Sequence, residues 1–268
     1  MVFVATSTSS NPAANQPVHK ALTKDYTGRT LWYRAFKYVF IGPLLQVLCP
    51  STVEGAENIP SSGAALIAYN HLSATDWLFV PLAVPRKVTH VAKSEYFTGT
   101  GFKGAFQRWF FSSAGQVPLD RSGGDASRAA LESLKKVLAK GNLAAIFPEG
   151  TRSPDGRLYK GKTGVARIAL ESKVPVIPVG VIGTDKVLAP DSAKFHPHPV
   201  TVRIGKPLDF SRFYDFVGNH YVERSIADEI MYEIMRLSGQ EYVDEYASRK
   251  KKGRGASGSG PATAPSAA

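Results

Sequence analysis

Short apolar runs alternate with amphipathic segments along most of the chain. The apolar runs are five to seven residues long and are bounded by Gly, Pro or polar residues, which is typical of strands. They occupy residues 64–69, 87–92, 115–119, 143–147, 176–182 and 200–205. Because helical segments fall between these runs, the pattern predicts an α/β fold over roughly residues 50 to 245. We expect a single, mostly parallel central sheet flanked by helices.

Three segments carry the 3.6-residue period of an amphipathic helix. The clearest is 125–140, which Gly141 follows. Its periodic apolar positions are Ala129, Leu131, Leu134, Val137 and Leu138. Segments 164–172 and 223–238 have the same character, so three helices are predicted there.

The two ends of the chain differ in composition from this alternating region. Residues 1–20 are polar and contain prolines, and residues 247–268 join a basic run to a Gly/Ser/Pro/Ala-rich tail. Both ends are therefore predicted to be disordered. Between them we expect a helical segment at a membrane interface, residues 21–50, followed by one folded domain at 51–246.

The formal net charge of +11 favours an anionic partner, which is a nucleic acid, an anionic lipid or a phosphorylated substrate. Cys49 is the only cysteine, which excludes a disulfide framework and a Cys-based zinc site. The first residues lack the basic start and long apolar run of a signal peptide. No stretch reaches the roughly 18 apolar residues needed to span a bilayer. We therefore expect a cytoplasmic protein, or one that lies on a membrane surface.

The stretch GRLYKGKT, residues 156–163, matches the phosphate-binding loop pattern G-x-x-x-x-G-K-[ST]. In a true loop of this kind a buried strand leads directly into the first glycine. Here the preceding residues are the polar TRSPD, and the nearest apolar run ends at Phe147. The context argues against NTP hydrolysis, although the basic residues of the loop could still meet phosphate.

A polar cluster follows the first apolar run, where α/β folds place their sites. In the sequence NHLSATDW, His71 and Asp76 are five residues apart, which would place them about 140° apart on one regular helix. They can meet only if His71 lies in a turn and Asp76 in the first turn of a helix, with Ser73 or Thr75 as its cap. A carboxylate on one imidazole nitrogen would leave the other as a base. The alternative is a capped helix beside a hydrogen-bonded turn histidine.

Two further clusters also follow apolar runs. FPEGTRS, residues 147–153, places Glu149 and Arg152 around a glycine turn, and the planar fork of an arginine suits phosphate or carboxylate. The alternative is a Glu–Arg pair at the surface. GQVPLDR ends in Arg121. A fourth stretch, VPVIPV at 174–179, indicates mainly core packing.

Taken together and in order, these blocks resemble the 1-acylglycerol-3-phosphate acyltransferase family of glycerolipid enzymes. The family's N-H-x-x-x-x-D block is matched from Asn70 to Asp76, and its F-P-E-G-T-R-S block is matched in full. GQVPLDR resembles the G-x-[IVF]-x-[IVL]-x-R block, with a proline where a hydrophobic residue is usual. VPVIPV resembles the fourth block, so the resemblance covers about residues 70 to 180.

The resemblance implies that an acceptor hydroxyl attacks a fatty acyl thioester carried by coenzyme A or acyl carrier protein, with no other cofactor and no metal. His71 would be the general base, and Asp76 would orient it. Residues implied to bind the substrate's phosphate end are Glu149, Gly150, Thr151, Arg152, Arg121 and Lys93. No covalent acyl-enzyme is required, which is consistent with the absence of a G-x-S-x-G motif.

Lipid substrates imply contact with a membrane, and two segments have suitable compositions. Residues 28–50 are aromatic and apolar with basic residues at one end, which suits an interfacial helix. Within residues 97–115, the aromatic residues Phe102, Phe106, Trp109, Phe110 and Phe111 are interleaved with Lys103 and Arg108. The alternative is that both segments cover the core. We expect a peripheral protein at the cytoplasmic face of the cell membrane.

Other functions stay open at this point. The acceptor could be glycerol 3-phosphate or another lysophospholipid in place of 1-acylglycerol 3-phosphate. A basic nucleic-acid-binding protein is favoured only by charge, and no recognised RNA or DNA motif supports it.

Overall fold

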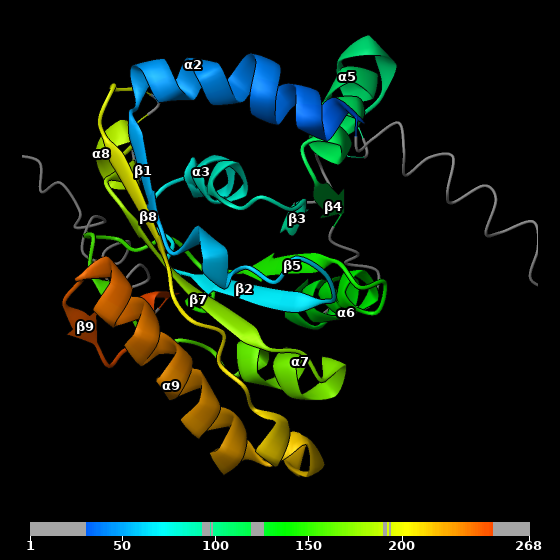
Figure 1. Cartoon of the computed structure of the whole chain (residues 1–268), viewed down its shortest axis with the longest axis vertical. Helices are drawn as coiled ribbons and strands as arrows, with labels where there is room; N and C mark the ends of the chain where they lie inside the picture. Colours follow the sequence, from blue (N-terminus) through cyan, green and yellow to red (C-terminus); the bar gives the residue numbers. More distant parts are fainter. Residues whose placement is uncertain are drawn as a thin grey trace, which may run out of the picture.

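The structure, a computed structural model, describes residues 31–92, 97, 99–118, 126–189, 192 and 194–248. Its centre is a seven-stranded sheet in the order β1-β8-β7-β2-β5-β3-β4 (Figure 1). The strands are β1 (Ser51–Glu54), β2 (Ala65–Tyr69), β3 (Val88–Ala92), β4 (Gln116–Pro118), β5 (Leu143–Ile146), β7 (Val176–Ile182) and β8 (Val200–Ile204). A small second sheet pairs β6 (Leu158–Tyr159) with β9 (Tyr242–Val243).

The central sheet is mostly parallel, as the strand–helix alternation predicts. β2 pairs in parallel with β5 on one side and β7 on the other, and β5, β3 and β4 continue in the same direction. The exception is β8, which runs antiparallel to β7 and carries β1 parallel to itself at the edge. The carboxyl ends of β2, β5 and β3 therefore meet at one edge of the sheet.

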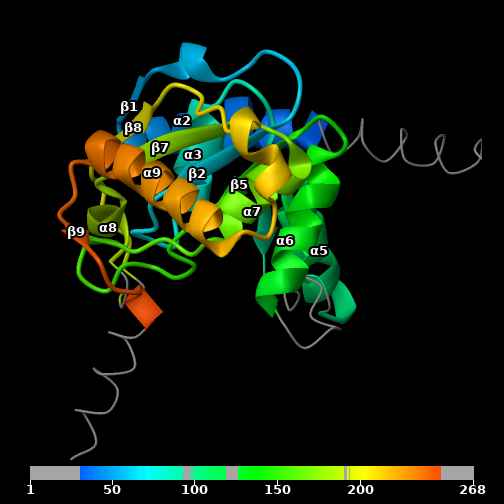
Figure 2. The same cartoon turned by 90° about the horizontal axis from the view of Figure 1, so that it is seen from below.

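Helices cover both faces of the sheet (Figures 1 and 2). Side chains alternate along β2, so Leu66 and Ala68 pack with α6 (Ala126–Leu138), α7 (Gly164–Ser172) and α9 (His220–Ser238). Ala65, Ile67 and Tyr69 face the other way, toward α2 (Ile41–Leu48) and α3 (Asp76–Ala83). All five residues of β2 are buried because each of them belongs to one of these two cores.

The three predicted helices correspond to α6, α7 and α9, although α9 begins three residues earlier than expected. Asn219 caps α9, and its side chain accepts hydrogen bonds from the N–H groups of Tyr221 and Val222. Further elements that the periodicity did not indicate are α5 (Gly101–Ser113), α8 (Thr184–Val187), the 3₁₀ turns Ala56–Asn58 and Ser211–Phe216, and strands β1, β6 and β9. At the end of the described chain, Ala247 is fully buried, although the basic tail was predicted to start there.

The N-terminal segment is helical from residue 31 to α2, with a π-helical stretch at Phe36–Phe40. Lys37 turns inward from it and is buried, and its ammonium donates to the carbonyl oxygens of Pro81 and Val84 at the end of α3. Burial lowers the pKa of Lys37 to about 8. Within the described residues, the chain has no helix of sufficient length and apolarity to span a bilayer.

Candidate active site

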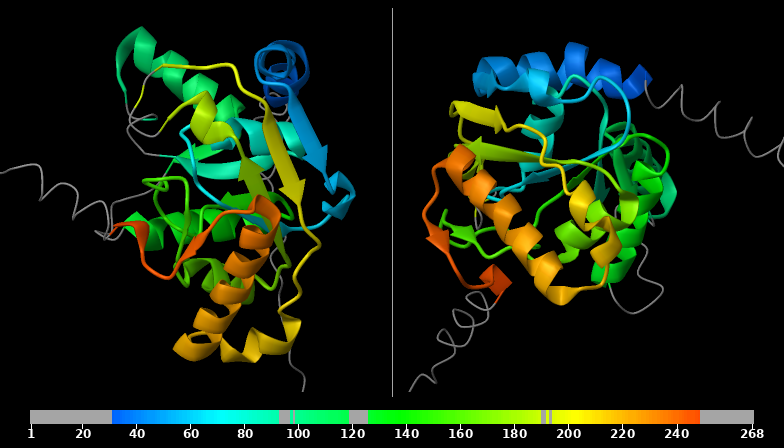
Figure 3. Two further views of the ribbon diagram at one scale, coloured as in Figure 1. Left: turned by 90° about the vertical axis from the view of Figure 1, so that its left-hand side faces the viewer. Right: turned by 60° about the horizontal axis from the view of Figure 1, so that its bottom comes forward.

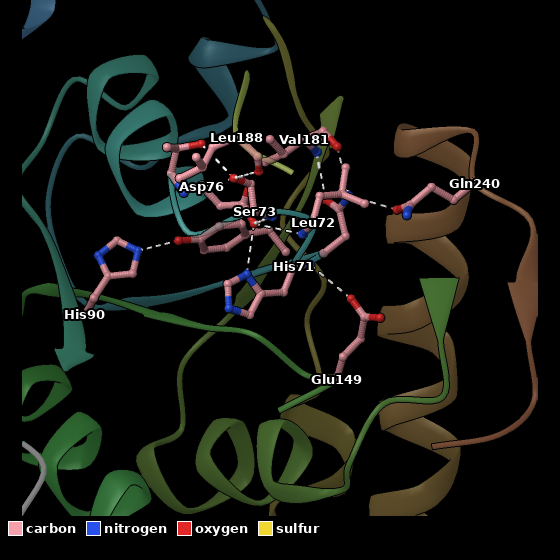
Figure 4. A network of polar contacts seen from close by, with 12 residues as sticks. His71, Leu72, Ser73, Asp76, His90, Glu149, Val181, Leu188 and Gln240 are labelled. Carbon is pink, nitrogen blue, oxygen red and sulfur yellow. Dashed lines mark hydrogen bonds and ion pairs between the residues drawn. The ribbon is translucent and has the colours of Figure 1, made fainter. Parts of the chain in front are cut away.

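The turn after β2 brings the predicted histidine and aspartate together (Figure 4). β2 ends at Tyr69, the chain turns through residues 70–75, and α3 begins at Asp76. The Nδ1 atom of His71 lies 2.9 Å from the Oδ2 atom of Asp76. The predicted geometry is therefore confirmed, with His71 in the turn and Asp76 in the first turn of the helix.

The Asp76 carboxylate also organises the turn that carries its partner. Its Oδ2 atom accepts hydrogen bonds from the backbone N–H groups of Leu72 (2.8 Å) and Ser73 (2.9 Å). The expected capping by Thr75 is wrong, whereas the Ser73 hydroxyl accepts from the backbone N–H of Thr75 at 3.2 Å, directly before the helix. Thr75 occupies the cap position without a side-chain cap bond, and the Ser73 hydroxyl donates to the carbonyl oxygen of Leu188. Asp76, at the start of the helix, instead binds backwards to the turn.

The two members of the pair differ in exposure. The Asp76 side chain is 0% exposed, whereas that of His71 is 19% exposed. Among the described residues, none hydrogen-bonds the Nε2 atom of His71. The imidazole is thus held at Nδ1 by a buried anion while Nε2 is available to a substrate, the arrangement a general base needs.

Glu149 braces the same turn from the neighbouring strand end. Its Oε1 atom accepts from the backbone N–H of His71 at 2.9 Å, and its Oε2 atom accepts from the N–H of Tyr159 at 3.0 Å. The backbone N–H of Ser153 donates to the carbonyl oxygen of His71 at 2.7 Å. Glu149 is only 2% exposed, so the alternative of a surface Glu–Arg pair is wrong for this residue. These hydrogen bonds join the N-H-x-x-x-x-D block to the F-P-E-G-T-R-S block.

Asn70 fixes the turn to the opposite neighbour of β2. Its side-chain amide donates to the carbonyl oxygen of Val181 and accepts from the N–H of Val181, both at 2.8 Å. It also donates to the side chain of Gln240 at 2.8 Å. Asn70 and Asp76, which lie on either side of His71 in the sequence, therefore hold the backbone of the turn in place. The His71 side chain stays partly exposed.

An aromatic cluster beside His71 was not predicted. The ring of Phe147 stacks on His71 with centroids 3.7 Å apart and an interplanar angle of 17°, and it also contacts Tyr69. The Tyr69 hydroxyl hydrogen-bonds Nε2 of His90. Tyr69 and His90 come from β2 and β3, the strands on either side of β5. For Tyr69 and Phe147 the available signal was their position at the end of an apolar run, whereas His90 lies in the middle of β3.

Burial keeps this second imidazole neutral. The pKa of His90 falls to about 3, first because burial disfavours the cation and then because His71 is nearby. Burial, with a smaller contribution from Asp76, raises the pKa of Tyr69 well above its ordinary value. The Tyr69–His90 pair therefore adds no charge beside the His71 imidazole.

Of the remaining predicted site residues, Gly150, Thr151 and Arg152 directly follow Glu149. Gly150 adopts a φ of 71°, which a side chain would disfavour, and Thr151 and Arg152 follow it, both partly exposed. Arg121 and Lys93 lie outside the described residues, after β4 and β3 respectively. The fourth block, residues 174–179, leads into β7 (Val176–Ile182), whose burial except at its last residue agrees with the interpretation of the block as core.

The phosphate-loop resemblance fails its structural test. Residues 147–157 form turns and irregular chain, so no strand leads into Gly156. The pattern instead contains β6, and α7 begins after it at Gly164. The loop therefore lacks the strand–loop–helix geometry that cradles a nucleotide phosphate chain.

Comparison with known proteins agrees with the geometry of this edge. The Acyltransferase family model matches residues 50–182, which include the His71–Asp76 turn, the Glu149 turn and β7. The chain belongs to this acyltransferase family.

Within the family, the chain is similar to 1-acyl-sn-glycerol-3-phosphate acyltransferases, as the four sequence blocks indicated. The protein of that name from Cocos nucifera is 31% identical over 175 residues, covering 65% of this chain and 54% of the relative. A chloroplastic protein of that name from Arabidopsis thaliana is 33% identical over 162 residues, covering 60% and 44%. The chain therefore spans about half the length of these relatives.

The fold comparison covers more of the chain. The crystal structure of the 1-acyl-sn-glycerophosphate acyltransferase PlsC from Thermotoga maritima superposes with a TM-score of 0.56. It is 26% identical, and the match covers 84% of both chains. The predicted fold class is confirmed by this match.

Proposed function

We propose that the chain transfers a fatty acyl group from an acyl thioester to the free hydroxyl of 1-acylglycerol 3-phosphate, forming phosphatidic acid. The observation that carries the proposal is the buried Asp76 holding one nitrogen of a partly exposed imidazole. The names of the similar proteins give the acceptor class.

In this mechanism His71 removes the proton of the acceptor hydroxyl through Nε2. The oxygen attacks the thioester carbonyl, and the tetrahedral intermediate collapses with cleavage of the carbon–sulfur bond. The imidazolium then returns the proton to the departing thiolate, so the base is regenerated. Asp76 stabilises the transient imidazolium and keeps the Nδ1 proton in place.

The acceptor phosphate requires cations near this edge. Arg152 follows the Glu149 turn and supplies a planar fork for phosphate, and the Gly150–Thr151 backbone lies next to it. Arg121 and Lys93 follow the strands β4 and β3, whose carboxyl ends point to the same edge. We infer that these residues bind the phosphate end, and Glu149 contributes by holding the His71 turn.

The membrane proposal is supported by one exposed aromatic surface. Trp109 of α5 contacts Trp32 and Phe36 of the N-terminal helix, with centroids 5.1 and 5.6 Å apart. Figure 3 shows α2 in blue and α5 in green on the same side of the molecule. Exposed apolar side chains of these two segments include Leu31, Trp32, Tyr38, Val39, Phe40, Leu44, Val47, Phe102 and Phe106. We infer peripheral binding to the cytoplasmic face of the membrane through this surface.

The same segments also cover the core, because Tyr33, Leu45 and Cys49 are buried. The core-covering interpretation therefore holds for the buried side of this helix, and membrane contact is proposed for its exposed side.

The test is acyl transfer from labelled acyl-CoA and acyl-acyl carrier protein to a panel of acceptors. The panel holds 1-acylglycerol 3-phosphate, glycerol 3-phosphate, an uncharged monoacylglycerol and other lysophospholipids. We expect the wild-type protein to form labelled phosphatidic acid. The rate of acyl transfer should fall by a factor of about 10²–10⁴ in His71→Ala. Preference for another acceptor would change the proposed substrate but leave the proposed acyl-transfer mechanism in place. Undiminished transfer by a folded His71→Ala protein would remove the mechanism.

A further inference from the structure

A cleft of about 840 Å³ opens between α6 and α7, beside the Glu149 turn. Its lining includes Phe147, which stacks on His71, and Gly150, the neighbour of Glu149. The cleft therefore lies next to the proposed active site. Neither the histidine–aspartate pair nor the expected Arg152 site accounts for it.

The walls of the cleft combine apolar and cationic side chains. Apolar lining comes from Leu131, Ile146, Phe147, Val165 and Ile168. The cations are Arg128 from α6, Lys162 from the loop before α7, and Arg167 from α7. This mixture suits a ligand that joins a phosphate to a flexible, less polar chain.

The acidic residues of the lining are already neutralised. Lys135 lies 2.7 Å from a carboxylate oxygen of Glu132 and 2.8 Å from one of Glu171, and so pairs with both. Arg167 is engaged by a two-point contact with Glu223 at 3.0 and 3.1 Å. The cation that stands apart is Lys162, whose ammonium has no hydrogen bond or ion pair within the described part of the chain.

Lys162 is nevertheless held in place at the catalytic turn. Its backbone N–H donates to the carbonyl oxygen of Pro148 at 2.8 Å. A Cβ atom on Gly150 would lie only 3.1 Å from the Lys162 ammonium, so the side chain passes directly over that turn. A lysine positioned in this way at the mouth of a cleft has its charge available for a ligand.

We propose that Lys162 binds a phosphate group of one of the two substrates within the α6–α7 cleft. The phosphate belongs either to the phosphopantetheine-bearing carrier of the acyl donor or to the acceptor. The proposal rests on the proposed function, and it gives the GRLYKGKT loop a role that does not involve a nucleoside triphosphate. Lys162 is a binding residue here, and the proton transfers remain with His71.

The chain offers a matched control two residues away. Lys160 carries the same charge in the same loop, but its ammonium is paired with Asp244 at 2.8 Å. Lys160→Ala therefore removes one unit of charge without touching the cleft. Lys162→Arg keeps the charge and tests rescue.

Binding is measured by calorimetry without turnover, with coenzyme A and with a short-chain 1-acylglycerol 3-phosphate below its micelle concentration. We expect Lys162→Ala to weaken one of the two by about tenfold or more, because it removes one charge-assisted hydrogen bond. Lys162→Arg should recover most of the affinity, and Lys160→Ala should leave both ligands unchanged. Steady-state KM for the same substrate should rise in parallel, with kcat little altered.

Each outcome separates the site from the function. Weaker coenzyme A binding assigns the phosphate to the donor, and weaker 1-acylglycerol 3-phosphate binding assigns it to the acceptor. Unchanged affinity for both in Lys162→Ala, or an equal loss in Lys160→Ala, overturns the site while leaving acyl transfer intact. A wild-type protein that binds neither ligand overturns both proposals.

Discussion

The Oδ2 atom of Asp76 accepts three hydrogen bonds, from Nδ1 of His71 at 2.9 Å and from the N–H groups of Leu72 and Ser73 at 2.8 and 2.9 Å. Asp76→Asn can keep all three through its amide oxygen. The amide NH₂ takes the place of Oδ1, which is buried and has no partner within the described residues. The substitution therefore removes the charge and little else.

We expect Asp76→Asn to fold like the wild type and to lose about 10- to 10³-fold in kcat/KM. The loss is smaller than that of His71→Ala because the base remains and only its support is removed. Asp76→Ala serves as the contrast, because it also leaves the two backbone N–H groups of the turn without an acceptor. Each unsatisfied buried group costs about 1–3 kcal/mol, so the melting temperature should fall by several degrees.

The assay pairs thermal unfolding with steady-state acyl transfer for both variants. The reasoning requires activity and stability to separate, with Asn affecting activity alone and Ala affecting both. If Asp76→Asn retains normal kcat/KM, the buried charge has no part in the reaction. If its activity falls only in proportion to unfolded protein, Asp76 is purely structural.

Further predictions concern the phosphate, the membrane and pH. Arg152→Ala should raise the KM for phosphorylated acceptors roughly ten- to hundredfold and leave an uncharged acceptor unaffected, with partial rescue by lysine; equal effects on both acceptors would contradict a phosphate contact. Phe102, 91% exposed, should lower liposome co-sedimentation when changed to Asp, whereas Tyr221→Asp on α9, where Tyr221 is 84% exposed, should not; identical behaviour would move the membrane surface elsewhere. Burial lowers the pKa of His90 to about 3 in the folded chain, whereas an unfolded histidine has a pKa of about 6.5. Between about pH 3 and 6.5 the unfolded chain therefore binds one proton more than the folded chain at this residue, and the free energy of unfolding falls as the pH falls. His90→Asn should flatten the decline by up to about 1.4 kcal/mol per pH unit in urea titrations, and an unchanged slope would refute its neutral burial.

The parts of the site that sequence could predict are those set by local chain geometry. His71 and Asp76 follow an apolar run at a spacing that only a turn and a helix start can reconcile, and the structure has that arrangement. Glu149 was predicted at the site, but its bonds to the backbone of His71 and Tyr159 depend on the pairing of β2 with β5. Periodicity carries no information about that pairing.

The elements that were missed have weak local signals. β1 is four residues long and largely exposed, so no alternation marks it as a strand. β6 and β9 have two residues each and form only because distant segments meet. The Tyr69–His90 hydrogen bond likewise joins β2 and β3, two strands that are separated by β5 in the sheet. Both residues are buried only because these strands assemble into one sheet, which no single stretch of sequence indicates.

Lys37 of the N-terminal helix donates a hydrogen bond to the C-terminal end of α3, and Asp76 lies at the N-terminal end of α3. α3 has eight residues, so about 12 Å of rigid backbone separates the lysine contact from the Asp76 carboxylate. A bilayer bound at the aromatic surface would therefore meet the proposed catalytic turn at a fixed height and tilt, with no flexible tether between them. Under that geometry a lipid acceptor has to present its hydroxyl at this height, so depth in the bilayer becomes a criterion for substrate selection in addition to chemical structure.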